Sequence, residues 1–359
     1  MLVTPATSVT RTARTSPALL EVSADNWRLA ILLGFVVSAL AVAALPASAS
    51  FWIVGAAVAL VATTFVVNAY RRRYYGGLLV APAIVVLFLM NIFPLLWSLG
   101  LSFFAYRSNQ QTIRFVGLDN YIKVLTNDIA APDNWNALIN TGMFVVLTVS
   151  AQMIVGFLLA MLFAKQFPLR KYLLILVLTP MMLSVVASGV FFTYYYDPTF
   201  GILSYVMNSV TGGQFILMDS KAGAVGGIVF ADAWMWSPFV MLLVLAGLVS
   251  VPKYLYEAAA IDRVSAWRRF WSITFPYIRG LLMLALLFRT IEAFKLADLV
   301  ILLTKGGNDT MTISYHLIRI ANEQNKTSEG AAISYVMLFM VIVLTNLYLY
   351  LANRRNRES

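Results

Sequence analysis

Long apolar segments recur along this chain, and they constrain its fold more than any other feature. The 359 residues are 60% hydrophobic and only 12% charged, and the mean hydropathy is +0.80. A water-soluble protein of this size could not bury so much apolar surface. Each of these segments is long enough to cross a bilayer as a helix. The sequence therefore predicts an all-α polytopic membrane protein.

Eight apolar segments are long enough to cross a membrane, because about 20 helical residues cover about 30 Å. We therefore predict eight transmembrane helices, of which the first two form an N-terminal helical hairpin. The predicted spans are Arg28–Leu45, Phe51–Tyr70, Leu78–Phe104, Thr141–Ala164, Tyr172–Tyr194, Ala224–Leu248, Leu281–Leu303 and Ala331–Leu351.

The first predicted span has an alternative interpretation. Arg28, an apolar run and then Ala47-Ser48-Ala49 could form a signal peptide with its cleavage site. The apolar run is longer than the roughly 7–15 residues usual in such peptides, and it begins late in the chain. We therefore favour a retained helix that follows a flexible cytoplasmic tail.

The charge balance of +10, from 26 Lys and Arg against 16 Asp and Glu, could suggest nucleic acid as a partner. The basic residues instead cluster beside alternate apolar segments, as they do in the cytoplasmic loops of inner-membrane proteins. This pattern predicts the lipid bilayer and no nucleic acid as a partner. It places both termini and the loop around Glu257 in the cytoplasm.

The chain lacks the residues and motifs that several kinds of metal binding and catalysis require. It contains no cysteine and a single histidine, His316, so a thiolate or histidine metal site is not expected. The sequence has no G-x-x-x-x-G-K-[ST] phosphate loop, no H-E-x-x-H and no G-x-S-x-G motif. We therefore expect no catalytic residue, metal or cofactor in this chain, and an intramembrane enzyme is a distant alternative.

A polar, basic island from Pro252 to Gly280 separates two long apolar segments. Ser250 can cap a helix that begins near Pro252, and the following Glu and Ala residues are strong helix formers. A second helical stretch, Ser265 to Ile273, is expected to end near Pro276, whose ring disfavours helix before it. The pattern predicts a helix, a bend and a second helix outside the membrane.

This island resembles the EAA loop of the membrane subunits of bacterial ABC importers, in particular the maltose-type carbohydrate permeases. The resemblance rests on Glu257-Ala258-Ala259, Asp262, Ser265 and Ile273-Thr274-Phe275-Pro276. An amphipathic surface helix is the alternative, but it does not explain the downstream Ile-Thr-Phe-Pro. The similarity extends over residues 76 to 353 through three further motifs, Phe115–Tyr121, Asp197–Gly201 and Thr304-Lys305-Gly306-Gly307.

Two positions depart from the family pattern. The family usually has glycine where this chain has Arg263, after Asp262, and it usually ends the Thr304–Gly307 turn with proline, where this chain has Asn308. An arginine at position 263 should weaken any very tight backbone turn there.

The resemblance implies four parts of the chain and a set of partners. Residues 1–26 are a cytoplasmic tail, 27–75 the two-helix hairpin, 76–353 a six-helix permease core with the coupling loop 251–279, and 354–359 a second tail. Two ATPase subunits would bind ATP and Mg and press on the coupling loop. A second, different permease subunit and a periplasmic or lipid-anchored binding protein complete the importer. The expected coupling residues are Glu257, Ala258, Ala259, Asp262, Arg263 and Ser265.

The segment Arg289 to Asp298 places Arg289, Glu292, Lys295 and Asp298 at intervals of three residues within a predicted span. Charged side chains at membrane depth should face protein or water and pair with one another. One helical stripe of this kind could be a structural ladder of ion pairs or could line the translocation cavity. The resemblance favours the cavity for Arg289 and Glu292, because this helix contributes to the sugar site in the family.

Carbohydrates offer hydroxyl groups for hydrogen bonds and apolar ring faces for aromatic stacking. Trp234 is a further aromatic candidate nearby, although an isolated aromatic residue is more often part of the core or lipid-facing. The predicted substrate-binding residues are Gln152, Tyr195, Trp236, Phe239, Arg289, Glu292 and Phe294.

The resemblance thus predicts a permease that moves a sugar or polyol by alternating access. One alternative is the same architecture with another solute, such as glycerol phosphate, whose anionic group would suit Arg289. A membrane receptor or scaffold without transport is an alternative of a different class.

Overall fold

A computed structural model describes residues 83, 86–110, 113–126, 133–213 and 215–357. The predicted spans Arg28–Leu45 and Phe51–Tyr70 lie outside these residues. The chain divides into two compact units, with the boundary between Gly100 and Leu101. In the described part of the first unit, a π-helical turn, η1 (Phe88–Ile92), leads into α4 (Phe93–Ser102).

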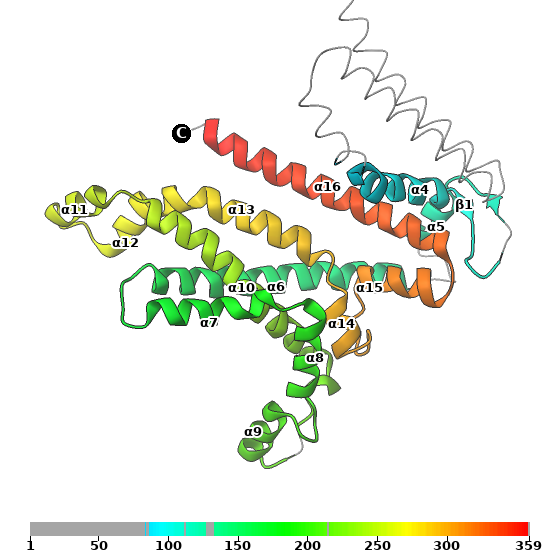
Figure 1. The fold of residues 1–359 in the computed structure, drawn as a ribbon, viewed down its shortest axis with the longest axis horizontal. Coiled ribbons are helices and arrows are strands. Elements are labelled where there is room, and N and C mark those ends of the chain that lie inside the picture. The colour runs from blue at the N-terminus through cyan, green and yellow to red at the C-terminus, as the bar shows by residue number, and fades with distance from the viewer. Residues whose placement is uncertain (1–82, 84–85, 111–112, 127–132, 214, 358–359) are drawn as a thin grey trace, which may run out of the picture. The chain divides into compact units, whose positions relative to one another are not determined.

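Four long apolar helices build the second unit (Figure 1). They are α6 (Asp133–Phe163), α10 (Lys221–Ser250), the continuous helix formed by α12 (Ala266–Arg269), η3 (Phe270–Thr274) and α13 (Phe275–Ala293), and α16 (Thr327–Arg357). Within the described residues these four are long and apolar enough to cross a membrane, and a bent helix pair raises the number to five. A helical bundle is confirmed, whereas the count of eight extends beyond the described residues.

The predicted span Tyr172–Tyr194 is wrong as a single helix, because it is broken near its middle. α7 (Arg170–Met182) and α8 (Val185–Tyr195) meet at an angle of 99°. Leu183 and Ser184 have extended backbone, and the Ser184 hydroxyl accepts a hydrogen bond from the Ala187 N–H at 3.1 Å. This serine therefore starts a new helix inside the apolar run. α9 (Ile202–Thr211) follows beyond α8.

The predicted span Leu281–Leu303 also differs from the structure. Its helix begins earlier, at Ala266, and ends at Ala293. A short turn leads to α14 (Asp298–Leu303), and α15 (Ile313–Ile318) and η4 (Arg319–Glu323) follow. α14 packs beside α8, with the Thr193 hydroxyl 3.4 Å from the Leu302 carbonyl. The two predicted spans that are interrupted, Tyr172–Tyr194 and Leu281–Leu303, are therefore in contact where α8 meets α14.

The expectation that a helix ends near Pro276 is wrong, since the helix runs through this proline. Proline clashes with the carbonyl of the residue four positions earlier. Here the preceding turn is widened to the π-helix Phe270–Thr274, in which the Phe275 N–H bonds to the Phe270 carbonyl. The same arrangement, a π turn followed by Phe-Pro, occurs at Phe88–Ile92. A π-helical turn is a known way for a helix to accommodate a local irregularity such as a proline.

Small elements lie at the end of the unit that also carries α15 (Figure 1). The strands β1 (Phe104–Ala105) and β2 (Arg114–Phe115) pair antiparallel, with Phe104 opposite Phe115. α5 (Asp119–Thr126) is fixed by Asn120, whose side-chain amide donates to two carbonyl groups at 2.8 Å. A short 3₁₀ turn, η2 (Leu217–Asp219), precedes α10.

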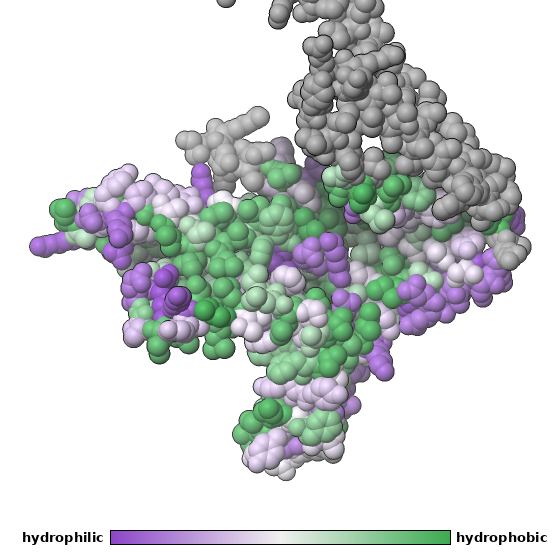
Figure 2. Space-filling model, viewed as in Figure 1, coloured by the Kyte–Doolittle hydropathy of each residue, from purple (hydrophilic) through white to green (hydrophobic). Residues whose placement is uncertain are grey.

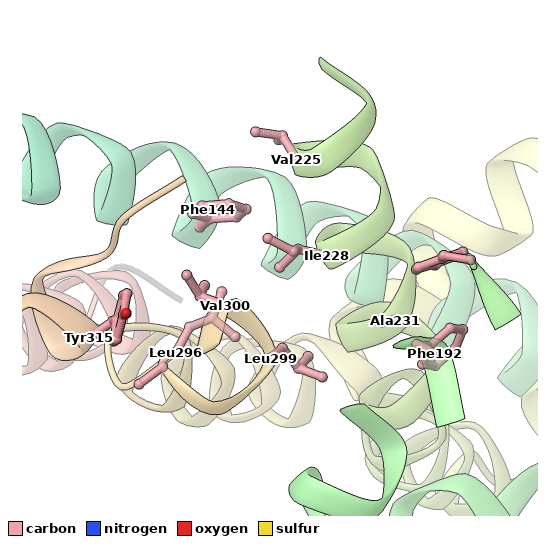
Figure 3. Close-up of a cluster of buried hydrophobic side chains, with 11 residues drawn as sticks. Phe144, Phe192, Val225, Ile228, Ala231, Leu296, Leu299, Val300 and Tyr315 are labelled. Carbon is pink, nitrogen blue, oxygen red and sulfur yellow. The ribbon is translucent and has the colours of Figure 1, made fainter. Parts of the chain in front are cut away.

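A cluster of buried apolar side chains holds α6, α8, α10 and α14 together (Figure 3). Phe144 from α6 and Ile228 from α10 are fully buried, and Leu299 and Val300 from α14 lie against them. The cluster explains why α14 stays inside the bundle although it is only six residues long.

The surface of the bundle is largely apolar along its sides, and hydrophilic residues gather at both ends, one of which carries α11 (Lys253–Ile261) and α12 (Figure 2). Large apolar side chains are exposed on two of the long helices, among them Val146, Ile154 and Leu158 of α6 and Phe339 and Val343 of α16. Helices with this pattern are surrounded by lipid or by other membrane chains.

A close crossing of two long helices depends on a glycine. A Cβ atom on Gly156 of α6 would lie 2.6 Å from the Val240 Cβ and 2.7 Å from the Ser237 carbonyl of α10. No atom lies within 4 Å of the corresponding position at Gly142 on the same helix. Small residues at such crossings let two membrane helices approach closely.

We expect Gly156→Ala to lower the free energy of unfolding by about 1–3 kcal/mol, because α6 and α10 must move apart. The matched variant Gly142→Ala should leave it unchanged or raise it by up to about 1 kcal/mol through helix propensity. Thermal unfolding of the purified chain in detergent measures both. Equal transition temperatures for the two variants would contradict a tight crossing at Gly156.

Candidate functional site

A cluster of polar side chains lies inside the bundle, where three long helices meet. α6 contributes Gln152, α10 contributes Asp232 and α13 contributes Arg289. Their exposed fractions are only 0%, 4% and 2%. Polar and ionisable groups at such positions in membrane helices are rare and mark structural pairs or functional sites.

Gln152 bridges the two charged groups. Its Nε2 donates to Asp232 Oδ2 at 2.6 Å, and its Oε1 accepts from Arg289 Nε at 2.7 Å. Arg289 Nη2 also lies 3.8 Å from Asp232 Oδ2. The amide orients both ions and satisfies hydrogen-bonding positions that would otherwise be unpaired in an apolar interior.

The Arg289 guanidinium also lies over the indole ring of Trp236, 4.5 Å from its centroid. A ring face attracts a cation, more strongly where water is scarce. Arg289 is therefore held by an amide, a carboxylate and an aromatic ring. Because one carboxylate balances one guanidinium, the cluster carries no net charge when both groups are ionised.

The prediction of a single charged stripe is wrong. α13 ends at Ala293, so Lys295 lies in the following turn and Asp298 begins α14. Arg289 points into the bundle toward Asp232, whereas Glu292 is exposed and forms an ion pair with Lys295 at 3.0 Å. A break in the helix after Ala293 ends the regular spacing on which the stripe depended.

Asp232 is the important residue that the sequence analysis missed. Its signal was available, because it is an acidic residue in the middle of the predicted span Ala224–Leu248. An ionisable residue at that depth should have been sought as the partner of Arg289. The regular spacing of charges from Arg289 to Asp298 instead suggested partners on the same helix.

A row of three aromatic rings joins α10 to α8. The rings of Trp234 and Phe191 are nearly parallel, with centroids 5.9 Å apart and an interplanar angle of 17°. Phe191 is followed by Tyr195 at 6.0 Å and 18°. Phe191 is half exposed, at 51%. Such a row offers flat apolar surface between α10 and α8.

The remaining predicted substrate residues lie in different surroundings. Phe239 is partly buried and makes an edge contact with Phe288. Phe294 is buried in an apolar cluster with Val145 and Val149 of α6. Gln152, Trp236 and Arg289 come together around Asp232, and Tyr195 belongs to the aromatic row.

The predicted coupling residues lie on α11 and the turn after it. Glu257 and Ala258 are exposed, whereas Ala259 is buried toward the rest of the chain. The helix begins after Pro252, and Ser250 does not cap it, because its hydroxyl donates to the Gly247 carbonyl instead. Ile261 is 83% exposed at the end of the helix. α11 thus has one buried side, at Ala259, and one exposed side.

Arg263 adopts the left-handed conformation that glycine favours, with φ of 52°. The Arg263 N–H bonds to the Ala260 carbonyl and the Val264 N–H bonds to the Ala259 carbonyl. These two bonds define a Schellman motif at the helix end. The arginine therefore keeps the tight turn, at a conformational cost, although we expected it to weaken this turn.

Three contacts fix the helix that follows α11. The Ser265 hydroxyl caps α12 by accepting from the Arg268 N–H at 3.4 Å. The hydroxyls of Tyr256 and Thr274 lie 2.9 Å apart, and the Arg269 guanidinium lies 5.9 Å from the centroid of the Tyr256 ring. These contacts join α11 to the start of the long helix that carries Arg289.

At the opposite end of the bundle, the turn at Thr304–Asn308 has an unusual backbone. Lys305, Gly306, Asn308 and Asp309 all have positive φ. Asn308, with φ of 51°, occupies a conformation closed to proline, which explains its departure from the family pattern. Hydrogen bonds from Lys221 and Asn140 hold the pKa of Asp309 below its usual value.

The Asp197–Gly201 motif forms a second turn, next to α8. The Asp197 carboxylate accepts from the Thr199 hydroxyl and N–H at 2.8 Å and from the Phe200 N–H at 3.2 Å. The bonds from Thr199, followed by that from Phe200, lower the pKa of Asp197. Among the described residues, no group of three or more His, Cys, Asp or Glu side chains is placed to hold a metal ion.

The bundle, its buried polar cluster and the exposed helix α11 together define a polytopic helical membrane protein with a polar site between its spans. The chain belongs to the family of binding-protein-dependent transport system inner membrane components, which matches residues 152–357.

Curated relatives agree with this assignment. The trehalose/maltose transport system permease protein MalF of Thermococcus litoralis is 31% identical over 81% of this chain and 97% of its own length. The sulfoquinovosyl glycerol permease SmoG of Agrobacterium fabrum is 31% identical, over 77% of this chain and 90% of its own. The trehalose permease SugA of Mycobacterium tuberculosis is also 31% identical, over 78% and 89%.

The fold is also that of a solved transporter. A chain from a bacterial ABC transporter involved in the import of the acidic polysaccharide alginate superimposes with a TM-score of 0.69. The match covers 80% of this chain and 97% of that chain at 17% identity. At this identity the likeness concerns the fold, and it confirms the ABC importer permease architecture that the EAA resemblance predicted.

We expect Asp232→Ala to destabilise the chain by about 3–5 kcal/mol, because it leaves the buried Arg289 charge without its counter-ion. The double variant Asp232→Ala with Arg289→Met should be more stable than Asp232→Ala alone, because it removes both charges. Thermal unfolding in detergent measures the series. Glu292→Ala, which removes the exposed pair with Lys295, is the control and should cost less than about 1 kcal/mol. A double variant no more stable than Asp232→Ala alone would contradict the pairing.

We expect Arg263→Gly to stabilise the α11 turn by about 1 kcal/mol, because glycine adopts the left-handed conformation without the penalty of a side chain. The same substitution inside a helix, Arg268→Gly, should cost about 1 kcal/mol. Amide hydrogen exchange at position 263 and at Val264 reports the turn. Faster exchange in the Arg263→Gly variant would show that the arginine side chain holds the turn in another way.

Proposed function

We propose that this chain is the translocation subunit of an ATP-driven importer that moves a neutral sugar or related polyol into the cell. The proposal rests on two features of the bundle, which are the charge-balanced polar cluster around Asp232 and the row of aromatic rings formed by Trp234, Phe191 and Tyr195. Two of the named relatives are a trehalose/maltose permease and a trehalose permease, which supports an uncharged sugar. The third is a permease for sulfoquinovosyl glycerol, a sugar derivative with an anionic sulfonate. Hydroxyl groups and apolar ring faces are the two features that a sugar presents to such a surface.

The aromatic and the polar residues would bind different parts of a sugar. Trp234, Phe191 and Tyr195 offer parallel ring faces for stacking. Gln152, Asp232 and Arg289 offer hydrogen-bonding groups, but in this state those groups are occupied by one another. A sugar hydroxyl would therefore exchange with an internal bond, which limits the net gain in binding energy. Weak binding suits a site that must release its ligand.

An anionic solute such as glycerol phosphate is the less favoured alternative within transport. The guanidinium that would attract it, Arg289, already faces Asp232 and Trp236. A phosphate group would meet the Asp232 carboxylate in the same cluster, so repulsion offsets attraction. A membrane receptor or scaffold without transport offers no reason for the exposed α11 or the family match.

Energy would enter through α11. We propose that two ATPase subunits, which bind ATP and Mg, receive α11 in a cleft, with Glu257 as the polar anchor and Ala258 allowing close approach. Asp262, Arg263 and Ser265 would shape the turn, and Ala259 would seat the helix on the rest of the chain. The contacts of Tyr256 with Thr274 and Arg269 would carry motion into the helix of Arg289. Alternating access follows from that motion.

The full architecture belongs to the same proposal. It comprises eight spans with both termini in the cytoplasm, a hairpin at 27–75, the permease core at 76–353 and tails at 1–26 and 354–359. A second, different permease subunit would complete the pathway, and a periplasmic or lipid-anchored binding protein would deliver the substrate. α11 and the α6–α7 connection lie at the same end of the bundle (Figure 1), which supports a common cytoplasmic side for both.

The substrate proposal is tested by uptake in cells that express the complete transport system. Uptake of labelled neutral disaccharides should exceed that of glycerol phosphate. Trp234→Ala should reduce the sugar uptake rate about tenfold by removing one stacking face, whereas Trp234→Phe should retain most of it. Val146→Ala, a change on the exposed face of α6, is the matched control. If the cells took up glycerol phosphate faster than the disaccharides, the proposed substrate would be an anionic solute and not a neutral sugar.

The coupling proposal is tested separately with Glu257→Lys, which reverses the charge of the proposed anchor. We expect uptake to be abolished while the amount of chain in the membrane stays unchanged. Glu323→Lys, the same reversal on an exposed glutamate of η4, should retain uptake. Unchanged uptake in the Glu257→Lys variant would remove this residue from the coupling role.

A further inference from the structure

The continuous helix Ala266–Ala293 is longer than a bilayer requires. Its 28 residues extend about 42 Å, whereas the hydrocarbon core is about 30 Å thick. Apart from the buried Arg289, its arginines, Arg268, Arg269 and Arg279, lie in its first half, and residues 266–279 contain no Asp or Glu. The first turns of this helix therefore extend into the headgroup layer, at the end of the bundle that carries α11.

Aromatic side chains form a stripe along these first turns. Trp267, Trp271 and Phe275 follow at intervals of four residues, and their rings are in contact, with centroids 5.6 Å and 4.8 Å apart. Trp267 is 73% exposed and Trp271 is 45% exposed. Tryptophan is enriched where membrane proteins cross from hydrocarbon to headgroups, because one part of its ring is apolar and the N–H is polar.

The stripe faces away from the bundle, since other residues of the same turns make the inward contacts. Phe270 lies edge-on to Phe157 of α6 at 6.0 Å, and the buried Thr274 meets Tyr256 of α11. These contacts fix the rotation of the helix about its axis. The two tryptophans therefore project outward from the helix, next to the exposed side chain of Arg268.

The arginines of this segment have no acidic partner within the described part of the chain. None of the salt bridges there includes Arg268, Arg269 or Arg279. The Arg269 guanidinium instead lies near the ring of Tyr256. Exposed arginine beside exposed tryptophan, at headgroup depth, matches the charge of an anionic phosphate and the mixed polarity of the interface.

We propose that Trp267, Trp271 and Arg268 form a binding surface for the headgroup of an anionic phospholipid, which we call the headgroup surface. The tryptophans lie among the glycerol and upper acyl groups, and Arg268 binds the phosphate. An ATPase subunit is the other possible occupant of basic and aromatic groups near α11. The lipid is favoured because the stripe lies on the spanning helix itself, whereas the exposed tip of α11 at Ile261 is available to a protein partner.

The headgroup surface adjoins the contacts that join α11 to the long helix. Arg269 and Thr274, which meet Tyr256, lie on the same turns as Trp267 and Trp271. A bound lipid would fix the first turns of this helix while α11 moves against them. The surface thus supplies an anchored support near the proposed coupling contacts, although its lipid binding does not depend on transport.

The absence of cysteine from the chain makes a depth measurement direct. The full-length Trp267→Cys variant is labelled with a fluorophore and placed in vesicles of phosphatidylcholine that contain a lipid spin-labelled at its headgroup. We expect strong quenching, because position 267 lies in the headgroup layer. The matched Ile261→Cys variant, at the exposed tip of α11, should be quenched several-fold less. Equal quenching at the two positions would overturn the proposal.

The choice of lipid is measured on the purified full-length chain by native mass spectrometry with phosphatidylglycerol and phosphatidylcholine. We expect tighter binding of phosphatidylglycerol, and Arg268→Gln should weaken it about fivefold. Arg268→Lys should retain it, and Arg114→Gln, an exposed arginine of β2, is the control. No preference between the lipids, or displacement of the bound lipid by added ATPase subunit, would contradict the proposal. Neither the quenching nor the lipid-binding measurement involves uptake. The lipid proposal can therefore fail or succeed independently of the importer proposal.

Discussion

A buried carboxylate and a buried guanidinium can coexist in this apolar bundle only if their charges and hydrogen-bonding positions are satisfied inside it. Gln152 meets that requirement by bonding to both Asp232 and Arg289. Because the three residues come from α6, α10 and α13, the requirement fixes the rotation of three long helices at once. Apolar packing alone would tolerate small rotations, since many methyl groups are interchangeable, whereas a bridged ion pair accepts a narrow range of geometries.

The interrupted spans obey the same physical constraint on the backbone. A helix that breaks at membrane depth frees N–H and C=O groups, which lipid cannot satisfy. The Ser184 hydroxyl provides one of the missing partners at the start of α8. The Thr312 and Ser314 hydroxyls do the same for the carbonyls of Leu296 and Phe294 after α13. Side chains near each break therefore make the irregular backbone tolerable.

The sequence predicted what depends on local composition. Apolar length identified the long helices, and the Glu257–Pro276 spacing identified the family and the position of α11. It failed where the outcome depends on contacts between distant segments. Asp232 and Arg289 lie on different helices, so intervals of three residues around Arg289 suggested the wrong partners. Ser184 breaks an apolar run that looks continuous, and a widened π turn lets the helix pass Pro276, which a rule for regular helices excludes.

Arg263 shows how a local rule can fail without a failure of the fold. Glycine is favoured in a left-handed turn because it avoids a steric penalty of about 1–2 kcal/mol, and that penalty is small beside the contacts that fix the turn. Two backbone bonds close the end of α11, and the buried Ala259 seats the helix. The chain therefore keeps the geometry of the loop while presenting a cation where the family usually presents none. Any partner of α11 must accommodate that charge, so Arg263 bears on the choice of partner rather than on the fold.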